Sequence, residues 1–290
     1  MYMICSSRNR HWKKSLCIIT DEVYMMTIFR YELKQLKKNI IIWALSMGVL
    51  IFLMLPTYIG FTSGGDPLMA EAMNNNPLFE ALGVGTAFVM TPLGMFSFLG
   101  SFAMIAAAIH GMSIAFSSHT KEYESKSAEF LLTKPHSRGE VFWGKFFACT
   151  VDSLLVGIAY TAGAGLALLT VKNVSIDWRA FLLIAGSLVL VELMFVVFGI
   201  VAGTFFSNVR TPVLMSSCVM LALFCLSTMS MKINQPILGY LTPFAFFKPM
   251  NTVKTGFYEW NFVVWYVVLG VGLLLTSYRK FLKKDVVFGG

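Results

Sequence analysis

The sequence predicts an all-α integral membrane protein with six transmembrane helices, and two observations carry that prediction. Hydrophobic residues make up 57% of the 290 residues, charged residues make up only 13%, and the mean hydropathy is +0.70. Soluble domains carry about 25% charged residues, so most of this protein's surface must face lipid. In addition, the chain contains several charge-poor stretches long enough to cross a bilayer, which takes about 17–25 residues of helix.

Six charge-poor stretches are the predicted spans. The first, fifth and sixth hold no charged residue, the second holds His110, the third Asp152 and the fourth Glu192. A seventh apolar piece, residues 237–247, is shorter and is broken by Pro243, so we interpret it as a re-entrant or interfacial segment. The predicted spans cover about residues 40–60, 94–117, 147–171, 180–206, 213–231 and 260–278.

Lysine and arginine are distributed unequally between the two sides that these spans separate. Most of the 23 basic residues lie in the N-terminal tail, in residues 117–145 and in the C-terminal tail. Because short basic loops remain inside, we expect both termini and residues 117–145 to be cytoplasmic, in a multi-pass protein of the cytoplasmic membrane. The net charge of +8 suits anionic membrane lipid, and we expect no nucleic-acid partner.

The segment before the first span has two parts. We expect residues 1–25 to be a disordered tail or an upstream extension, and residues 26–290 to form the transmembrane domain. Residues 27–39 interleave apolar side chains such as Leu33 and Leu36 with lysines and an arginine. This pattern predicts an N-terminal amphipathic helix at the membrane interface.

A polar stretch, residues 117–145, separates the second and third spans. Thr120 can cap a short amphipathic helix, and Pro135 ends it. Trp143 and Lys145 then lead into the third span, with Trp143 at interface depth and Lys145 snorkelling towards water. A cytoplasmic helix of this kind can receive force from a soluble partner, which favours transport over catalysis.

Motifs for catalysis are missing from the sequence. The four histidines form no HExxH motif and no pair four residues apart, so no metal site is predicted. The chain also has no GxSxG motif and no glycine-rich phosphate-binding loop, so we expect it to hydrolyse no ATP by itself. Gly199 and Gly203 form a GxxxG pattern, which in an apolar segment is weak evidence for helix contact.

Asp152 and Glu192 are the acidic residues within the predicted spans. A charge in lipid is costly, so such residues usually face the protein interior or water. Asp152 lies close to the cytoplasmic end of its span and can simply reach the interface, whereas Glu192 lies near the middle of its span. Both are candidate residues of a translocation path.

Residues 117–145 resemble the first cytoplasmic segment of bacterial ABC-2-type transporter permeases. The shared pattern is acidic residues, a small-residue pair with Glu, two apolar residues, Pro-x-Ser-Arg and then Gly-Lys. Here it consists of Glu122, Glu124, Ser127-Ala128-Glu129, Leu131-Leu132, Pro135-His136-Ser137-Arg138 and Gly144-Lys145. Lys126 stands where a glycine is common, which bears on the local backbone bend. The order of spans and the basic helix before them extend the resemblance over residues 26–284.

The resemblance implies that this segment is a coupling helix, which docks into a groove on a separate ATPase subunit. Apolar side chains would anchor it and flanking charges would set its register. The implied contact residues are Glu122, Tyr123, Glu124, Glu129, Phe130, Leu131, Leu132, Pro135 and Arg138.

The resemblance also implies the function of a permease subunit in an ATP-driven exporter. Such a subunit dimerises as a homodimer or heterodimer, and ATP and Mg are held by the partner ATPase, so no cofactor is expected on this chain. The implied cargo is amphipathic, of the drug, antimicrobial-peptide or lantibiotic class. Two alternatives remain open, namely an ATP-independent secondary transporter with Glu192 as its ion or proton site, and a membrane-embedded enzyme.

Overall fold

The computed structural model describes residues 10–57, 91–124, 138–170, 176–206, 211–233, 236–249, 252 and 255–283. Every regular element in these ranges is helical, and six helices are long and apolar enough to cross a membrane. The prediction of an all-α protein with six spanning helices is therefore confirmed. The six are α1 (Arg10–Met54), α6 (Pro92–Glu124), α8 (Arg138–Thr170), α9 (Trp178–Phe205), α10 (Pro212–Ile233) and α14 (Trp260–Lys283).

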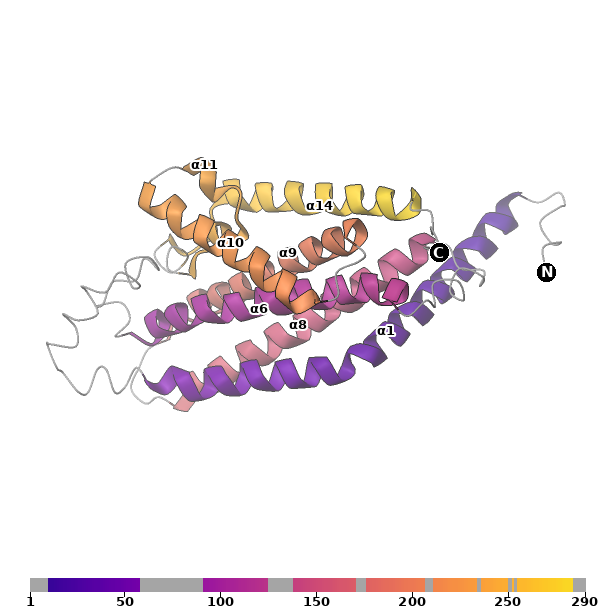
Figure 1. Ribbon diagram of the computed structural model, residues 1–290. Coiled ribbons are helices and arrows are strands. Elements are labelled where there is room, and N and C mark those ends of the chain that lie inside the picture. The colour runs from indigo at the N-terminus through magenta and orange to yellow at the C-terminus, as the bar shows by residue number, and fades with distance from the viewer. Residues whose placement is uncertain are drawn as a thin grey trace, which may run out of the picture.

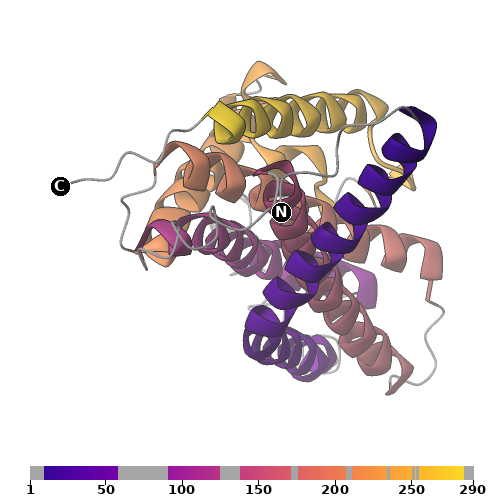
Figure 2. The same cartoon turned by 90° about the vertical axis from the view of Figure 1, so that its right-hand side faces the viewer.

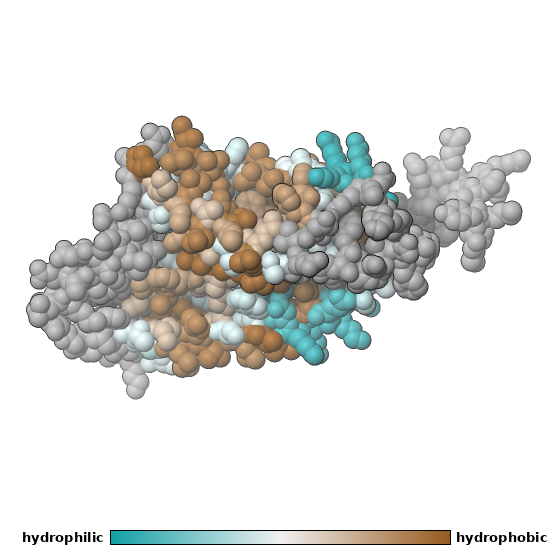
Figure 3. All heavy atoms as spheres, viewed as in Figure 1, coloured by the Kyte–Doolittle hydropathy of each residue, from teal (hydrophilic) through white to brown (hydrophobic). Residues whose placement is uncertain are grey.

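The long helices form one elongated bundle, with α1 along one side and α14 along the other (Figures 1 and 2). Exposed basic residues such as Arg30, Lys34 and Lys280 lie where α1 enters the bundle and α14 ends, and we call this the basic end. Figure 3 shows hydrophilic residues gathered there, beside a broad band of hydrophobic residues over the rest of the bundle. This separation is what a helical bundle in a bilayer requires.

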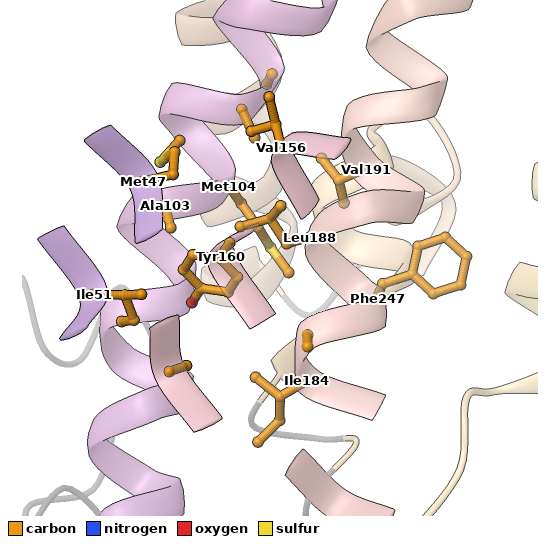
Figure 4. Packing of buried hydrophobic residues seen from close by; sticks show 14 of the residues in the cluster. Met47, Ile51, Ala103, Met104, Val156, Tyr160, Ile184, Leu188, Val191 and Phe247 are labelled. Carbon is orange, nitrogen blue, oxygen red and sulfur yellow. The ribbon is translucent and has the colours of Figure 1, made fainter. Parts of the chain in front are cut away.

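The hydrophobic core lies between α1, α6, α8 and α9 (Figure 4). Ile51 of α1, Met104 of α6, Tyr160 of α8 and Leu188 of α9 are each buried in it. Side chains that point outwards from the same helices are largely apolar and exposed, as expected for surfaces that face lipid.

The GxxxG pattern of α9 marks a close contact with α6. A Cβ atom added at Gly199 would overlap the carbonyl oxygen of Met112, and one at Gly203 would lie 2.8 Å from Cβ of His119. Small residues let two helix backbones approach closely in a membrane, where packing replaces the hydrophobic effect as the force of association. The weak indication from the sequence is thus confirmed as a helix contact.

Helix α14 is held to α9 by two tyrosine hydroxyl groups. Tyr258, just before α14, donates a hydrogen bond to the carbonyl oxygen of Leu183 at 2.5 Å, and Tyr266 donates to that of Leu190 at 3.0 Å. Only Ser277 among the described residues of α14 is buried. The Ser277 and Thr204 hydroxyl groups form a third hydrogen bond between α14 and α9 at 2.8 Å. These polar contacts add to the packing of half-buried α14 side chains, such as Phe262 and Leu269, against the core.

The apolar piece predicted as re-entrant or interfacial forms two short helices, α11 (Pro236–Gly239) and α12 (Pro243–Phe246), between α10 and α14. Phe244 packs against Phe195 of α9, with ring centroids 5.3 Å apart, and Thr242 donates a hydrogen bond to the carbonyl oxygen of Leu223 in α10 at 2.9 Å. The segment is therefore packed into the bundle at the end opposite the basic end (Figure 1).

Helix α1 is not divided into an amphipathic helix and a separate span, contrary to the prediction from the sequence. The amphipathic segment 27–39 and the first span form one continuous helix that begins at Arg10, which is drawn as a single bent ribbon in Figure 1. It is followed by a short 3-10 helix, Leu55–Thr57. The interfacial position of residues 27–39 and the division at residue 25 stay predictions.

Candidate functional site

The predicted coupling segment connects α6 with α8 at the basic end. Residues 125–137 and the side chains of residues 121–124 lie outside the part of the chain that the structure describes. The predicted contacts in these two ranges are Glu122, Tyr123, Glu124, Glu129, Phe130, Leu131, Leu132 and Pro135. Arg138 is described, and it begins α8 with its guanidinium donating a hydrogen bond to the carbonyl oxygen of Leu282 at 3.1 Å.

The helix cap predicted at Thr120 is wrong. Thr120 is buried inside α6, which continues to Glu124, and its hydroxyl donates a hydrogen bond to the carbonyl oxygen of Phe116 at 3.1 Å. A threonine hydroxyl can bond to the carbonyl one turn earlier instead of capping a helix start, and here it does so. The second span therefore runs on into the polar stretch as one helix.

Lys145 does not snorkel towards water, contrary to the prediction. Its side chain is 1% exposed, and its ammonium nitrogen lies 3.9 Å from Oε1 of Glu32, which is 2% exposed. Lys145 also donates a hydrogen bond to the carbonyl oxygen of Ser118, and the Ser118 hydroxyl donates to Oε2 of Glu32 at 3.4 Å. A buried ammonium group is tolerated because a carboxylate and a carbonyl oxygen replace its water.

These three residues join three helices, and we call Glu32 of α1, Ser118 of α6 and Lys145 of α8 the ion-pair cluster. Next to it, a Cβ atom added at Gly144 would lie 2.9 Å from a methyl group of Ile28 in α1. The Gly-Lys pair therefore has a structural role. Gly144 leaves room for α1 to pack closely, and Lys145 forms an ion pair with Glu32 of α1. The sequence offered one clue to Glu32, which is the only acidic residue in 27–39.

The structure brings Asp152 and Glu192 together around a histidine. Nδ1 of His110 lies 2.8 Å from Oε1 of Glu192, and Nε2 of His110 lies 3.8 Å from Oδ2 of Asp152. All three side chains are 0% exposed. Asp152 therefore lies inside the bundle, and the interpretation that it reaches the interface is wrong.

Helix α1 completes this site. Nδ2 of Asn39 lies 3.1 Å from Nε2 of His110, and the Trp43 ring lies with its centroid 4.5 Å from that of His110. On the other side, a Cβ atom at Gly111 would lie 2.8 Å from the carbonyl oxygen of Glu192, so the glycine after His110 lets α9 approach. We call Asn39, His110, Asp152 and Glu192 the membrane cluster, which joins α1, α6, α8 and α9.

His110 and Asn39 were not recognised as site residues from the sequence. His110 offered one clue, because it is the only ionisable side chain in the predicted span 94–117. Ionisable residues within spans usually face the bundle interior and act together. Asn39 offered none, because it sits at the border between the amphipathic segment and the first span.

Several oxygens of the membrane cluster have no hydrogen-bond donor among the described residues. They are both carboxyl oxygens of Asp152 and Oε2 of Glu192, although the amide group of Asn39 lies near the Asp152 carboxyl group and the hydroxyl of Ser153 lies near that of Glu192. No lysine or arginine in the described ranges forms an ion pair with either carboxyl group. Unsatisfied buried oxygens are costly, so the protonation of this cluster matters for the stability of the bundle.

The membrane cluster is not arranged as a metal site. Within the described part of the chain, no group of three or more histidine, cysteine, aspartate or glutamate residues is placed to hold a metal ion. The two ring nitrogens of His110 face Glu192 and Asp152 on different sides, so the three side chains do not converge on one point.

Comparison with known proteins indicates the family of this chain. A search of curated proteins finds no match to the chain. Residues 26–286 match a family model described as ABC-2 family transporter protein, and this range includes all six candidate spans almost completely. Because the match covers most of its length, the chain belongs to the ABC-2 family of transporter proteins.

Proposed function

We propose that this protein is the membrane subunit of an ATP-driven exporter that works with a separate ATPase subunit. The chain is an ABC-2 transporter permease component, and the permeases of that family lack an ATPase domain. The energy source must therefore be supplied by another chain if transport is driven by ATP. A second permease, identical or related, would complete the path through the membrane.

The ion-pair cluster is the observation that best supports coupling through the segment between α6 and α8. Ser118 lies near the end of α6 and Lys145 near the start of α8, and both contact the buried carboxylate of Glu32 in α1. Force applied to residues 120–134 would therefore act on three helices at once. The core contacts of these helices would carry the movement into the bundle.

The basic end would face the cytoplasm in this proposal. Its exposed lysines and arginines favour the inner side of a membrane, and ATP is available there. The predicted anchor residues of the coupling helix, Tyr123, Phe130 and Leu131, would bind a groove on the ATPase. Glu122, Glu124, Glu129 and Arg138 would set the register through salt bridges.

The proposed cargo is an amphipathic compound of the drug, antimicrobial-peptide or lantibiotic class. The support for it is the resemblance of residues 117–145 to bacterial permeases that export such compounds. Exposed apolar side chains on the described helices are equally compatible with lipid contact, so they do not narrow the choice.

Purification of the tagged full chain from native membranes tests the ATPase partnership. We expect an ATPase with a glycine-rich phosphate-binding loop to co-purify in a ratio of about one to one with the permease. The substitution Leu131→Asp places a charge on the predicted apolar anchor, so it should remove the ATPase while the permease still inserts in the membrane. Trp178→Asp is the matched control, because Trp178 is 46% exposed at the opposite end of the bundle.

Two results would count against the proposal. If the ATPase remains bound in Leu131→Asp, the coupling assignment is wrong. If no ATPase co-purifies and the reconstituted protein transports without ATP, the exporter itself is wrong.

The second candidate is an ATP-independent carrier with Glu192 as its ion or proton site. The observation that favours it is the burial of Glu192 beside His110 and Asp152. In such a carrier, Glu192→Gln should abolish transport together with its dependence on pH. Transport by Glu192→Gln that keeps its rate and requires ATP would exclude the carrier.

A further inference from the structure

Four positive charges lie on the outward-facing side of α1, and we call Arg30, Lys34, Lys37 and Lys38 the basic stripe. All four side chains are exposed. Arg30, Lys34 and Lys38 follow one another at intervals of four residues, and Lys37 lies three residues after Lys34, so all four share one face of the helix. None of them forms an ion pair or a side-chain hydrogen bond with another residue whose side chain the structure describes. The described part of the protein therefore leaves the charge of the stripe unbalanced.

The acidic residue within this part of α1 does not balance the stripe. Glu32 lies two residues from both Arg30 and Lys34, a spacing that places it on the opposite side of the helix. It is 2% exposed and is engaged with Ser118 and Lys145. The members of the stripe also repel one another, because like charges four residues apart destabilise a helix. An anion bound on this face would remove that repulsion.

The same face of α1 becomes apolar directly after the stripe. Ile41 lies four residues after Lys37, and Leu45 lies four residues after Ile41, and both are exposed. One leaflet contributes about 15 Å of hydrocarbon, which equals about ten residues of helix and corresponds to residues 41–50. Figure 3 shows hydrophilic surface directly beside the hydrophobic band on the side of the bundle where α1 lies. This face therefore offers positive charge at the depth of lipid headgroups and apolar side chains at the depth of acyl chains.

We propose that this face of α1 is a binding site for an anionic phospholipid of the cytoplasmic leaflet. The phosphate group of the lipid contacts Lys34, Lys37 and Lys38, and an acyl chain lies along Ile41 and Leu45. Charge complementarity selects an anionic headgroup, since a zwitterionic lipid brings a positive charge of its own to the stripe. The continuation into the span selects a lipid over a soluble acidic protein, because such a protein would reach the charges but not the apolar residues inside the bilayer.

Lipid titrations of the purified full-length protein, followed by native mass spectrometry, test this site. The probes are phosphatidylglycerol, which is anionic, and phosphatidylcholine with the same acyl chains, which carries no net charge. We expect phosphatidylglycerol to bind about tenfold more tightly, because each basic residue near an anionic headgroup adds to the attraction. Equal affinities for the two lipids would overturn the proposal.

Substitutions in the basic stripe locate the site on α1. The triple variant with Lys34→Gln, Lys37→Gln and Lys38→Gln should bind phosphatidylglycerol about tenfold more weakly, close to the affinity for phosphatidylcholine. The triple variant with Lys34→Arg, Lys37→Arg and Lys38→Arg keeps the charge and should keep the affinity, which separates the effect of charge from a change in α1 itself. Unchanged affinity in the glutamine variant, or an equal loss in the arginine variant, would contradict the assignment.

Helix α14 provides a control with the same change in net charge. The substitutions Arg279→Gln, Lys280→Gln and Lys283→Gln remove three exposed charges at the same basic end. Lys280 is already engaged there, because its ammonium nitrogen lies 3.4 Å from the centroid of the Phe205 ring. This variant should keep most of its affinity for phosphatidylglycerol. A loss as large as that of the glutamine variant of the stripe would show a general attraction of the basic end to anions and would overturn a site on α1.

An acidic surface of the ATPase is the competing occupant of the basic stripe. Purification from native membranes distinguishes the two, because the glutamine variant of the stripe should retain the ATPase while it loses affinity for phosphatidylglycerol. Loss of the ATPase with unchanged lipid affinity would assign the stripe to the protein partner and overturn the proposal. The lipid titrations require neither an ATPase nor a transport substrate, so they test the lipid site independently of the proposed export.

Discussion

Buried charged side chains define the chemistry of this bundle at the scale of single residues. The sequence singled out Asp152 and Glu192 as acids within spans and Lys145 as part of the Gly-Lys motif, but it could not supply their partners. Glu192 binds a histidine 82 positions away, and Ser118 binds Glu32 across 86 positions. A single sequence does not show which residues form contacts across so many positions. The predicted snorkelling of Lys145 failed for this reason, because a lysine at a helix end reaches water unless a buried acid from another helix is present.

Lys145→Met should destabilise the protein strongly, because it leaves the carboxylate of Glu32 buried without its ammonium partner. Breaking a buried ion pair costs about 3–5 kcal/mol. We expect a marked fall in the thermal unfolding midpoint in detergent, measured by circular dichroism. Lys34→Met on the exposed face of α1 is the control and should have little effect.

Removal of both charges tests whether the ion pair itself is responsible. Glu32→Gln combined with Lys145→Met leaves no unpaired charge, so the double variant should be more stable than Lys145→Met alone. If the losses of stability in the single variants Glu32→Gln and Lys145→Met simply add in the double variant, Glu32 and Lys145 do not interact.

The six spanning helices are the features that the sequence predicted best at the scale of elements. The six spans follow from length and charge, and the GxxxG pattern of α9 marks a true contact with α6. The boundary of α6 was predicted less well, because Thr120 has the residue type of a cap but bonds within the helix. Residue type alone does not decide whether a threonine hydroxyl caps a helix start or bonds to a carbonyl oxygen within the helix. The packing of the surrounding helices decides it.

Gly199→Ala should weaken the packing of α9 on α6, since the new methyl group would overlap the carbonyl oxygen of Met112. Overpacking of this kind costs about 1–3 kcal/mol. Gly272→Ala on α14 is the matched control, because nothing lies within 4 Å of its added Cβ atom, and it should be neutral or slightly stabilising. Equal unfolding midpoints of the two variants would contradict the close contact.

The attachment of α14 to α9 should depend on pH through Tyr258. Burial raises the pKa of Tyr258 above its ordinary value of 10.0, although a hydrogen bond with Ser187 opposes the shift. The folded state therefore holds this phenol proton more tightly than the unfolded state. Its contribution to stability is complete below pH 10 and is lost as the pH rises further, through the pKa of the folded state.

Tyr258→Phe checks this dependence. The variant should lose part of the alkaline fall in the unfolding midpoint, whereas Tyr31→Phe, at a tyrosine that is 58% exposed, should keep it. An unchanged alkaline profile in Tyr258→Phe would mean that another group causes the fall.

The molecule as a whole has two layers of polar contacts in one bundle. The ion-pair cluster joins α1, α6 and α8 near the basic end, and the membrane cluster joins α1, α6, α8 and α9 further along the same helices. Helix α1 takes part in both. A displacement of α1 by the coupling segment would therefore change the ion pair and the environment of His110 together. The sequence predicted the membrane class and the family, whereas this connection depends on the three-dimensional arrangement alone.

Site-specific photo-crosslinking in native membranes tests the proposed binding of an ATPase by the segment between α6 and α8. A photoreactive amino acid at position 131 should form an adduct with a protein that carries a phosphate-binding loop. The same group at position 178, at the opposite end of the bundle, should form none. An ATPase adduct from position 178, or its absence from position 131 while the ATPase is present in the membrane, would show that the ATPase does not dock on the segment between α6 and α8.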